Sequence, residues 1–213
     1  MNAAQRKEEK ARKELEQWQH MCLYEEELRK AGKRLIAGVD EAGRGPLAGP
    51  VIAAAVILPE EAYLPGLNDS KKLSEKRRLE LEQQIKRTAL SWACSSANHL
   101  LIDRINILNA SKLAMERALK KLKKQPDFVL IDGNMQLKLS LPQKTIIKGD
   151  SLSVSIAAAS ILAKCARDRL MLQLDSRYPQ YYFAKHKGYP TALHKECLQN
   201  YGPSPVHRLS FKY

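Results

Sequence analysis

Cysteine is sparse in this sequence, and long apolar runs are missing from it. The four cysteines, Cys22, Cys94, Cys165 and Cys197, lie far apart and form no Cys-x-x-Cys pair. That spacing suggests neither a zinc knuckle nor a disulfide framework, so we interpret them as packing thiols in a reducing compartment. The first residues lack the apolar run of a signal peptide, and no apolar segment approaches the length that spans a bilayer. We therefore expect a cytoplasmic protein without membrane association.

Acidic residues are in the minority. The chain has 36 Lys and Arg against 23 Asp and Glu, which gives a formal net charge of +13 at pH 7. Because phosphate contacts release counterions and strengthen with every cation, a nucleic acid is the most natural partner. Ribosomal and membrane-surface proteins are often basic too, so charge by itself does not decide the partner.

The length and composition predict one globular domain with an appendage. At 213 residues and 44% hydrophobic, the chain can bury one substantial core. We expect residues 1–32 to form a charged helical extension and residues 33–213 to form the main domain, including a C-terminal helical region. Within the extension, apolar residues recur at three- to six-residue spacings. This thin stripe predicts a helix that lies on the domain surface and ends near Gly32.

Short apolar runs bounded by glycine or proline predict a sheet of about five strands. These strands are expected at residues 34–43, 50–59, 89–100, 128–134 and 144–150. Helices are predicted from Ser74 onward, over 107–124 and over 151–179. The order of elements indicates an α/β architecture, in which helices flank a mixed central sheet.

Four carboxylates stand at the ends of predicted strands. Asp40, Asp132 and Asp150 each follow an apolar run, and Glu41 is next to the first. Carboxylates gathered at strand ends repel one another unless a cation neutralises them, and Mg²⁺ prefers oxygen ligands. Two such ions about 3.5–4 Å apart activate water and stabilise the leaving oxygen of a phosphodiester. The pattern therefore points to nuclease chemistry.

Each carboxylate also has a purely structural interpretation. Asp132 precedes a glycine and fits a turn, while Asp150 fits the N-cap of a helix that begins at Ser151. A regular strand alternates its side chains, so the adjacent acidic pair cannot both point inward. We therefore expect the first strand to end or twist at that pair. Gly43 and Gly45 would permit this, and they would also let backbone N–H groups approach a ligand closely.

Seven blocks of the sequence resemble ribonuclease HII, the type 2 ribonuclease H of bacteria. They are GVDEAGRGPLAGPV, DSKKLS, INILNASKLAM, IDGN, IIKGDSLSVSIAAASILAKCARDR, YPQYYFAKHKGYPT and YGPSPVHRLSF. They occur in that family's order and cover roughly residues 34–213. The resemblance implies a ribonuclease H-like fold and a metal-dependent endonuclease that cuts the RNA strand of RNA–DNA hybrids. It also implies incision 5′ of single ribonucleotides in duplex DNA, which leaves 3′-OH and 5′-phosphate ends.

The same resemblance implies roles for individual residues. In such enzymes an acidic set holds two divalent ions, Mg²⁺ or Mn²⁺, in the substrate complex, and the matching positions here are Asp40, Glu41, Asp132 and Asp150. The turn of Gly43, Arg44 and Gly45 would grip the ribose 2′-OH and a phosphate, and Tyr189 would stack on the next sugar. The implied partner is an RNA–DNA hybrid or ribonucleotide-containing duplex, and the implied roles are ribonucleotide removal and RNA primer removal. We expect a monomer.

Further polar residues are candidates for contacts with the nucleic acid. They are Ser70, Lys71, Lys72, Lys164, Arg167, Lys185 and Lys187. Lys164 also stands four residues before Asp168, the spacing of an ordinary helix ion pair. No spacing links His186, His194 or His207 to the carboxylates, so we assign no general base.

Two other functions remain open from the sequence. The first is a type 3 ribonuclease H, which typically carries a lysine in its glycine turn and a folded N-terminal sheet domain. Arg44 and the charged N-terminal helix favour type 2. The second is a non-catalytic nucleic-acid-binding protein whose acidic pocket holds a structural ion.

Overall fold

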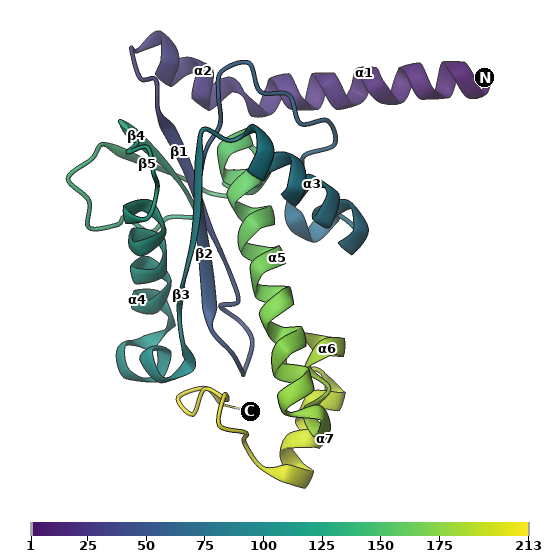
Figure 1. Ribbon diagram of the computed structural model, residues 1–213, viewed down its shortest axis with the longest axis vertical. Coiled ribbons are helices and arrows are strands. Elements are labelled where there is room, and N and C mark those ends of the chain that lie inside the picture. The colour runs from purple at the N-terminus through teal and green to yellow at the C-terminus, as the bar shows by residue number, and fades with distance from the viewer. Residues whose placement is uncertain (1, 213) are drawn as a thin grey trace.

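The protein has a five-stranded sheet with the strand order β3-β2-β1-β4-β5 (Figure 1). A computed structural model describes residues 2–212. The strands are β1 (Ile36–Ala42), β2 (Val51–Ile57), β3 (Ser91–Ala97), β4 (Phe128–Asp132) and β5 (Gln143–Ile146). The first three pair antiparallel, whereas β4 pairs parallel with both β1 and β5. The mixed sheet expected from the sequence is confirmed.

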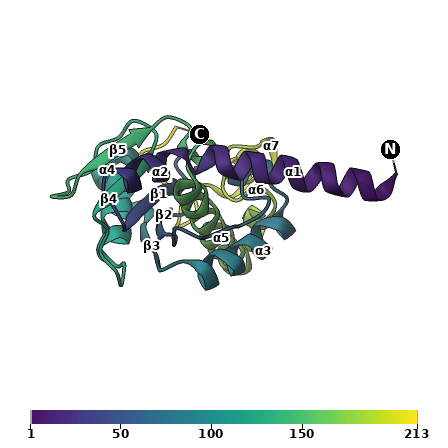
Figure 2. The same cartoon turned by 90° about the horizontal axis from the view of Figure 1, so that it is seen from above.

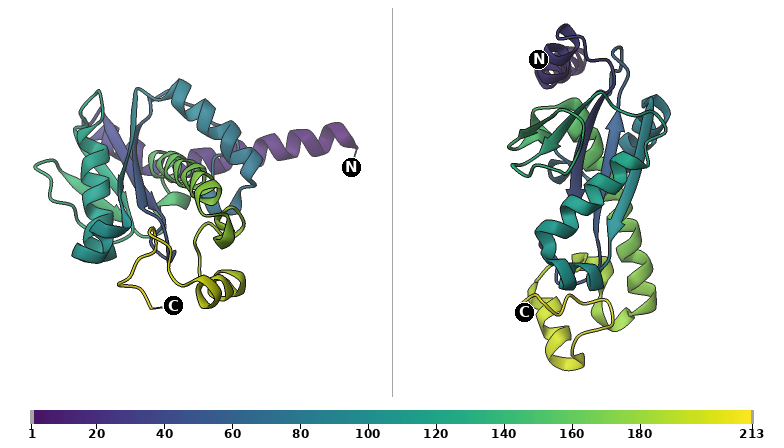
Figure 3. Two further views of the ribbon diagram at one scale, coloured as in Figure 1. Left: turned by 60° about the horizontal axis from the view of Figure 1, so that its bottom comes forward. Right: turned by 90° about the vertical axis from the view of Figure 1, so that its left-hand side faces the viewer.

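Helices cover both faces of this sheet. They are α1 (Ala3–Met21), α2 (Leu23–Lys30), α3 (Glu75–Thr88), α4 (His99–Lys120), α5 (Val154–Arg177), α6 (Phe183–His186) and α7 (Ala192–Tyr201). Short 3-10 turns lie at Ser70–Lys72, Gly149–Ser151 and Pro179–Tyr181. Figure 1 and Figure 3 show α4 on one face of the sheet and α5 with α3 on the other. No helix within residues 2–212 is long and apolar enough to cross a bilayer.

Side-chain alternation along β2 explains how one strand supports two cores. Ala53, Ala55 and Ile57 pack in the core that contains α4, while Ala54 and Val56 pack in the core that contains α5. All seven residues of β2 are buried, as expected for a strand covered on both faces. The helix α5 approaches the sheet closely through its run of small buried residues, Ala157–Ala159.

Two helices begin at residues other than those predicted. α4 begins at His99, eight residues earlier than expected, because Asn98 caps it and a kink at Asn106, with φ 64°, joins two helical pieces. α5 begins at Val154 with Ser153 as its N-cap. The interpretation of Asp150 as the cap of this helix is therefore wrong. Asp150 lies in the preceding 3-10 turn, four residues beyond the end of β5.

The N-terminal segment is two helices rather than one, with the break at Cys22. The beginning of α1 projects away from the rest of the molecule (Figures 1 and 2). From Trp18 onward the segment is packed inward, because Trp18, Met21 and Glu25 are all buried. The expectation of a helix that merely lies on the surface therefore holds only for its first part. Trp18 and Met21 pack in the core that contains α5, and the domain boundary expected at residue 32 stays a prediction.

Candidate active site

Asp40 and Glu41 lie near the end of β1, between β2 and β4. The ladder with β2 continues through Ala42, so β1 does not end at the acidic pair. The alternative expectation, a twist of the strand there, stays a prediction. By alternation the two side chains leave the strand on opposite faces. β1 and β4 run parallel with Val39 opposite Ile131, which brings Asp40 beside Asp132 one position further along. Although the two side chains leave the strand on opposite faces, the charge of Asp132 acts on both Asp40 and Glu41, so the strand ends assemble three of the four predicted carboxylates.

The turn Gly149–Ser151 brings the fourth carboxylate to the site. Asp132 Oδ1 accepts a hydrogen bond of 2.7 Å from the Gly149 N–H, which ties β4 to this turn. Asp150 follows directly, and its Oδ2 is 3.6 Å from Nζ of Lys71. The structure therefore gathers Asp40, Glu41, Asp132 and Asp150 in one region, from three separate parts of the chain.

Burial and repulsion raise the pKa of three of these carboxyl groups. Burial, followed by the charges of Glu41 and Asp132, raises the pKa of Asp40 well above its ordinary value. Burial also raises the pKa of Glu41, against the lowering effect of Arg44. Burial and the charge of Asp132 raise the pKa of Asp150. Groups that repel in this way are stabilised by a nearby cation.

The donor set fits a hard divalent cation. All of its donor atoms are carboxylate oxygens, and Glu41 Oε2 is buried without a hydrogen-bond partner among the described residues. Within residues 2–212, no three acidic, histidine or cysteine side chains already stand at the mutual spacing of a metal shell. Such a cation would therefore need further ligands, and Mg²⁺ in proteins usually takes these from water and substrate phosphates.

Ser70 lies beneath the carboxylates rather than on the surface. It is buried, and its hydroxyl is 2.9 Å from that of Ser160 on α5. Ser160 in turn hydrogen-bonds Asp40, which opposes the rise in the pKa of that carboxyl. Ser70 therefore supports Asp40 through Ser160. The next residue, Lys71, has a largely exposed side chain that reaches toward Asp150.

The glycine turn after β1 is held from behind by a buried arginine. Arg208 donates to the backbone oxygens of Gly43, Arg44 and Gly49, at 2.6, 2.9 and 2.9 Å. In a trans peptide the N–H points opposite to the C=O. Fixing the first two carbonyls therefore turns the N–H groups of Arg44 and Gly45 away from Arg208. Gly43 has a φ of 101°, a conformation that favours glycine.

Tyr189 lies next to this turn, as the sequence implied. A Cβ on Gly45 would be 3.6 Å from Cε1 of Tyr189, so the ring borders the turn directly. Tyr189 is 42% exposed, so part of the residue is accessible to a ligand. Arg44 Nη1 is 3.5 Å from Glu41 Oε1. The structure thus joins the turn, Tyr189 and the carboxylates into one continuous site.

Three of the candidate groove cations are engaged within the protein. Arg167 is wrong as a groove residue, because it is buried and donates to the carbonyls of Ala48, Pro50 and Lys187. Lys164 forms the helix ion pair that the sequence left open, at 2.7 Å from Asp168. The ammonium of Lys187 turns back to the carbonyl of Ala184.

Three buried histidines hold the loop that carries Tyr189. His186 Nδ1 accepts from the Gly188 N–H at 3.1 Å, and His194 Nδ1 is 3.0 Å from the Tyr189 carbonyl oxygen. His194 and His207 meet at 2.9 Å through their Nε2 atoms. Burial lowers the pKa of all three, that of His207 to about 4. They pack a loop, which agrees with leaving the general base unassigned.

Sequence reasoning missed Arg208 and Ser160 as supporting residues. Arg208 belongs to the block YGPSPVHRLSF, which carried the family resemblance without suggesting a role for the arginine. Ser160 gives no sequence signal beyond its small size on a predicted helix. Neither spacing nor periodicity identifies a side chain that acts by holding a distant backbone or carboxylate.

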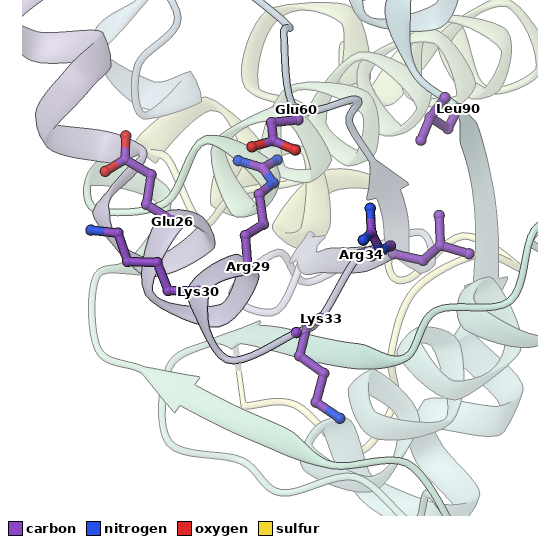
Figure 4. Close-up of a pocket in the computed structure, with 9 residues that line it drawn as sticks. Glu26, Arg29, Lys30, Lys33, Arg34, Glu60 and Leu90 are labelled. Carbon is purple, nitrogen blue, oxygen red and sulfur yellow. The ribbon is translucent and has the colours of Figure 1, made fainter.

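A pocket of about 720 Å³ lies at the other end of β1 (Figure 4). Its lining includes Arg29, Lys33 and Arg34 before β1, Glu60 after β2 and Leu90 before β3. Figure 4 shows the Arg29 guanidinium facing the Glu60 carboxylate across it. The predicted carboxylates are not part of this pocket, so it is separate from the candidate site.

Comparison with known proteins gives consistent matches. The sequence model of the family "Ribonuclease HII" matches residues 37–213. The chain is 50% identical over 207 residues to ribonuclease HII of Acetivibrio thermocellus, which covers 97% of this chain and 81% of the relative. It is 53% identical over 189 residues to ribonuclease HII of Syntrophotalea carbinolica, which covers 89% and 90%.

Solved structures share the fold. Ribonuclease H2 of Pyrococcus horikoshii matches with a TM-score of 0.71 and 25% identity, over 83% of this chain and 93% of that one. The RNase HII of Archaeoglobus fulgidus, solved in complex with PCNA, matches with a TM-score of 0.73 and 26% identity, over 84% and 96%. The Bst-RNase HIII solved with Mn²⁺ matches with a TM-score of 0.63 and 19% identity, over 84% and 67%.

Proposed function

Since this chain belongs to the ribonuclease HII family and is a ribonuclease H enzyme, we propose that it incises 5′ of single ribonucleotides in duplex DNA. It also hydrolyses the RNA strand of RNA–DNA hybrids and leaves 3′-OH and 5′-phosphate ends. The observation that carries the proposal is the buried acidic cluster at adjoining strand ends, bordered directly by the Arg208-held glycine turn. The activity serves ribonucleotide removal and RNA primer removal.

We assign the metal ligands to the four carboxylates. Asp40, Glu41, Asp132 and Asp150 would hold two divalent ions, Mg²⁺ or Mn²⁺, which when bound supply an activated water and stabilise the leaving oxygen. The Gly149 N–H keeps Asp132 oriented, and Ser160 does the same for Asp40. The Glu41 Oε2 atom, which has no hydrogen-bond partner among the described residues, would be free to coordinate an ion in this arrangement.

Ribonucleotide selectivity is assigned to the glycine turn and Tyr189. The N–H groups of Arg44 and Gly45 face away from Arg208 and can donate to a ribose 2′-OH, which distinguishes RNA from DNA. The Arg44 guanidinium contacts a neighbouring phosphate. The exposed ring of Tyr189 stacks on the sugar that follows the ribonucleotide.

Lys71 is the cation best placed to meet a phosphate near the scissile bond, because it is exposed and adjacent to Asp150. Ser70 acts from beneath, through Ser160. Lys164 and Lys187 are already engaged within the protein and would have to release those contacts to reach the duplex. We place the enzyme in the cytoplasm as a monomer.

Cleavage of labelled duplexes tests the proposal. A DNA duplex with one ribonucleotide is compared with an all-DNA duplex and a long RNA–DNA hybrid, each with Mg²⁺, Mn²⁺ or EDTA. We expect metal-dependent incision 5′ of the single ribonucleotide and an intact all-DNA control. Cleavage of the long hybrid alone would instead indicate type 3 specificity, and binding without cleavage would indicate the non-catalytic alternative.

A further inference from the structure

We propose that Glu25, on the N-terminal helix α2, is a positioning residue for the turn that carries Asp150. The inference rests on the proposed function, because it assigns Glu25 a role in the geometry of the metal ligands. Glu25 lies outside every sequence block that resembled the family. It is nevertheless fully buried, although a glutamate is rarely buried without a partner.

The carboxylate of Glu25 contacts the beginning of α5. Its Oε1 accepts from the Ser153 hydroxyl at 2.6 Å and from the Ser155 N–H at 3.0 Å. Oε2 is buried without a hydrogen-bond partner among the described residues. A negative group is favourable at a helix N-terminus. Ser153 already caps this helix through the Ile156 N–H at 3.2 Å, so α5 does not need Glu25 in order to begin.

The contact leads from Ser153 to the metal-ligand turn. The N–H groups of Leu152 and Ser153 both donate to the carbonyl of Gly149, at 2.9 and 2.8 Å. The N–H of the same Gly149 donates to Asp132. Glu25 therefore fixes one end of a short hydrogen-bonded segment whose other end orients Asp132, and Asp150 lies within it.

Ser155 is held from its other side by β1. A Cβ on Gly38 would lie 2.0 Å from the Ser155 carbonyl carbon, so the helix and the strand are in direct backbone contact there. Asp40 stands two residues further along β1, on the same face. The start of α5 is thus fixed between Glu25 and the strand that carries Asp40. A displacement of the beginning of α5 would therefore move two proposed metal ligands, Asp40 on β1 and Asp150 in the preceding turn.

Apolar packing keeps α2 in place. Tyr24 and Leu28 pack against the cluster that contains Ile36 and Ile156, and Met21 packs into the core beside α5. Glu25 lies between these anchors in the sequence, so its carboxylate has little freedom to leave Ser153. The N-terminal segment thereby contributes to the site although it supplies no ligand.

Direct measurement of Mn²⁺ binding to the full-length protein tests this inference. The signal of free Mn²⁺ in electron paramagnetic resonance reports binding without any substrate. We expect Glu25→Ala to weaken Mn²⁺ binding about tenfold, as typical for a residue that orients a ligand. Glu25→Gln keeps the Oε1 acceptor and is expected to bind Mn²⁺ as the wild type does. Glu26→Gln removes an exposed charge from the same helix and should change nothing.

The outcomes separate this inference from the proposed function. If the wild type and Asp132→Asn bind Mn²⁺ equally, the metal assignment itself fails. Suppose instead that Asp132→Asn loses Mn²⁺ binding, whereas Glu25→Ala, measured below the melting temperature of that variant, binds Mn²⁺ as the wild type does. Glu25 is then only structural, and the inference is overturned. Should Glu25→Ala not fold, Glu25→Asp replaces it, because the shorter side chain withdraws the acceptor from Ser153. Wild-type Mn²⁺ binding by Glu25→Asp would equally overturn the inference.

Discussion

Two of the groups of buried charges in this protein differ in how their hydrogen-bonding capacity is satisfied. Arg167 and Arg208 are buried cations, and each donates to three backbone carbonyls. The acidic cluster contains buried carboxylates that raise one another's pKa, and Glu41 Oε2 has no hydrogen-bond partner among the described residues. The arginines are complete within the protein. The carboxylates need a bound cation to offset their mutual repulsion.

This difference distinguishes the buried charges that stabilise the fold from the buried charges that are suited to bind a ligand. A buried charge that is fully hydrogen-bonded holds a fold, whereas buried like charges that repel mark a place for a ligand. The two groups meet at the glycine turn, because Arg208 holds Gly43 and Arg44, and Arg44 reaches Glu41. Substitutions in the two groups should therefore have opposite consequences for stability and activity.

The largest effect is expected at the acidic cluster. Asp132→Asn should lower cleavage by more than about a hundredfold, beyond what even outer-shell changes usually cost a metal site. Duplex binding and thermal stability should persist, because the substitution removes repulsion. Asp127→Asn, just before β4 rather than at its end, is the matched control. Undiminished cleavage by Asp132→Asn in Mg²⁺ and Mn²⁺ would refute the assignment.

A stability loss is expected for the arginines. Arg208→Met leaves three carbonyls without their charged donor and should lower the free energy of unfolding by about 3 kcal/mol. Denaturation in urea measures this. Arg44→Met, at the partly exposed arginine of the same turn, should weaken substrate binding and leave stability unchanged. Equal stability of the two variants would remove the distinction drawn between the groups.

The pH dependence of stability should also differ between the buried histidine His207 and the buried carboxyl group of Asp40. The pKa of His207 is lowered from 6.5 to about 4. Its contribution to the free energy of unfolding is therefore lost as the pH falls from 6.5 to about 4. The pKa of Asp40 is raised, so its contribution is present at low pH and lost as the pH rises. Acidification from pH 7 to 5 should therefore destabilise Asp40→Asn more than the wild type, and His207→Gln less. Identical slopes in the unfolding free energy would contradict both assignments.

The smallest effect is expected at Lys71, which is 78% exposed at its side chain. Lys71→Ala removes one phosphate contact, so the slope of log affinity against log salt should fall by about one. Lys76→Ala, at an exposed lysine of α3 that is not a candidate contact, is the control. A salt slope unchanged in Lys71→Ala would remove this lysine from the interface.

The strands and the acidic set were predictable because their signals are local. Apolar runs ending in Asp or Gly identified β1 and β4 directly, and the family blocks supplied the proposed ligand set. Contacts between segments that lie far apart in the sequence could not be predicted. Nothing near Glu25 in the sequence indicates Ser153, and the expected role of Arg167 failed because charge alone does not reveal that a side chain is buried. At the kink, Asn106 Oδ1 accepts from the Asn109 N–H and so begins the second helical piece, which explains why the sequence pattern indicated a helix only from residue 107.

The pairing of β1 with β4 has a consequence for how the enzyme is made. β1, β2 and β3 pair as neighbours in the sequence, whereas the parallel pair Ile36 with Phe128 closes a long stretch of chain. Such non-local pairing is slow to form. Because Asp40 and Asp132 lie on these two strands, we expect newly made or refolding chains to regain helix content before any nuclease activity. Refolding followed in parallel by circular dichroism and by cleavage would reveal that order, so partly folded molecules would be unable to cut nucleic acid.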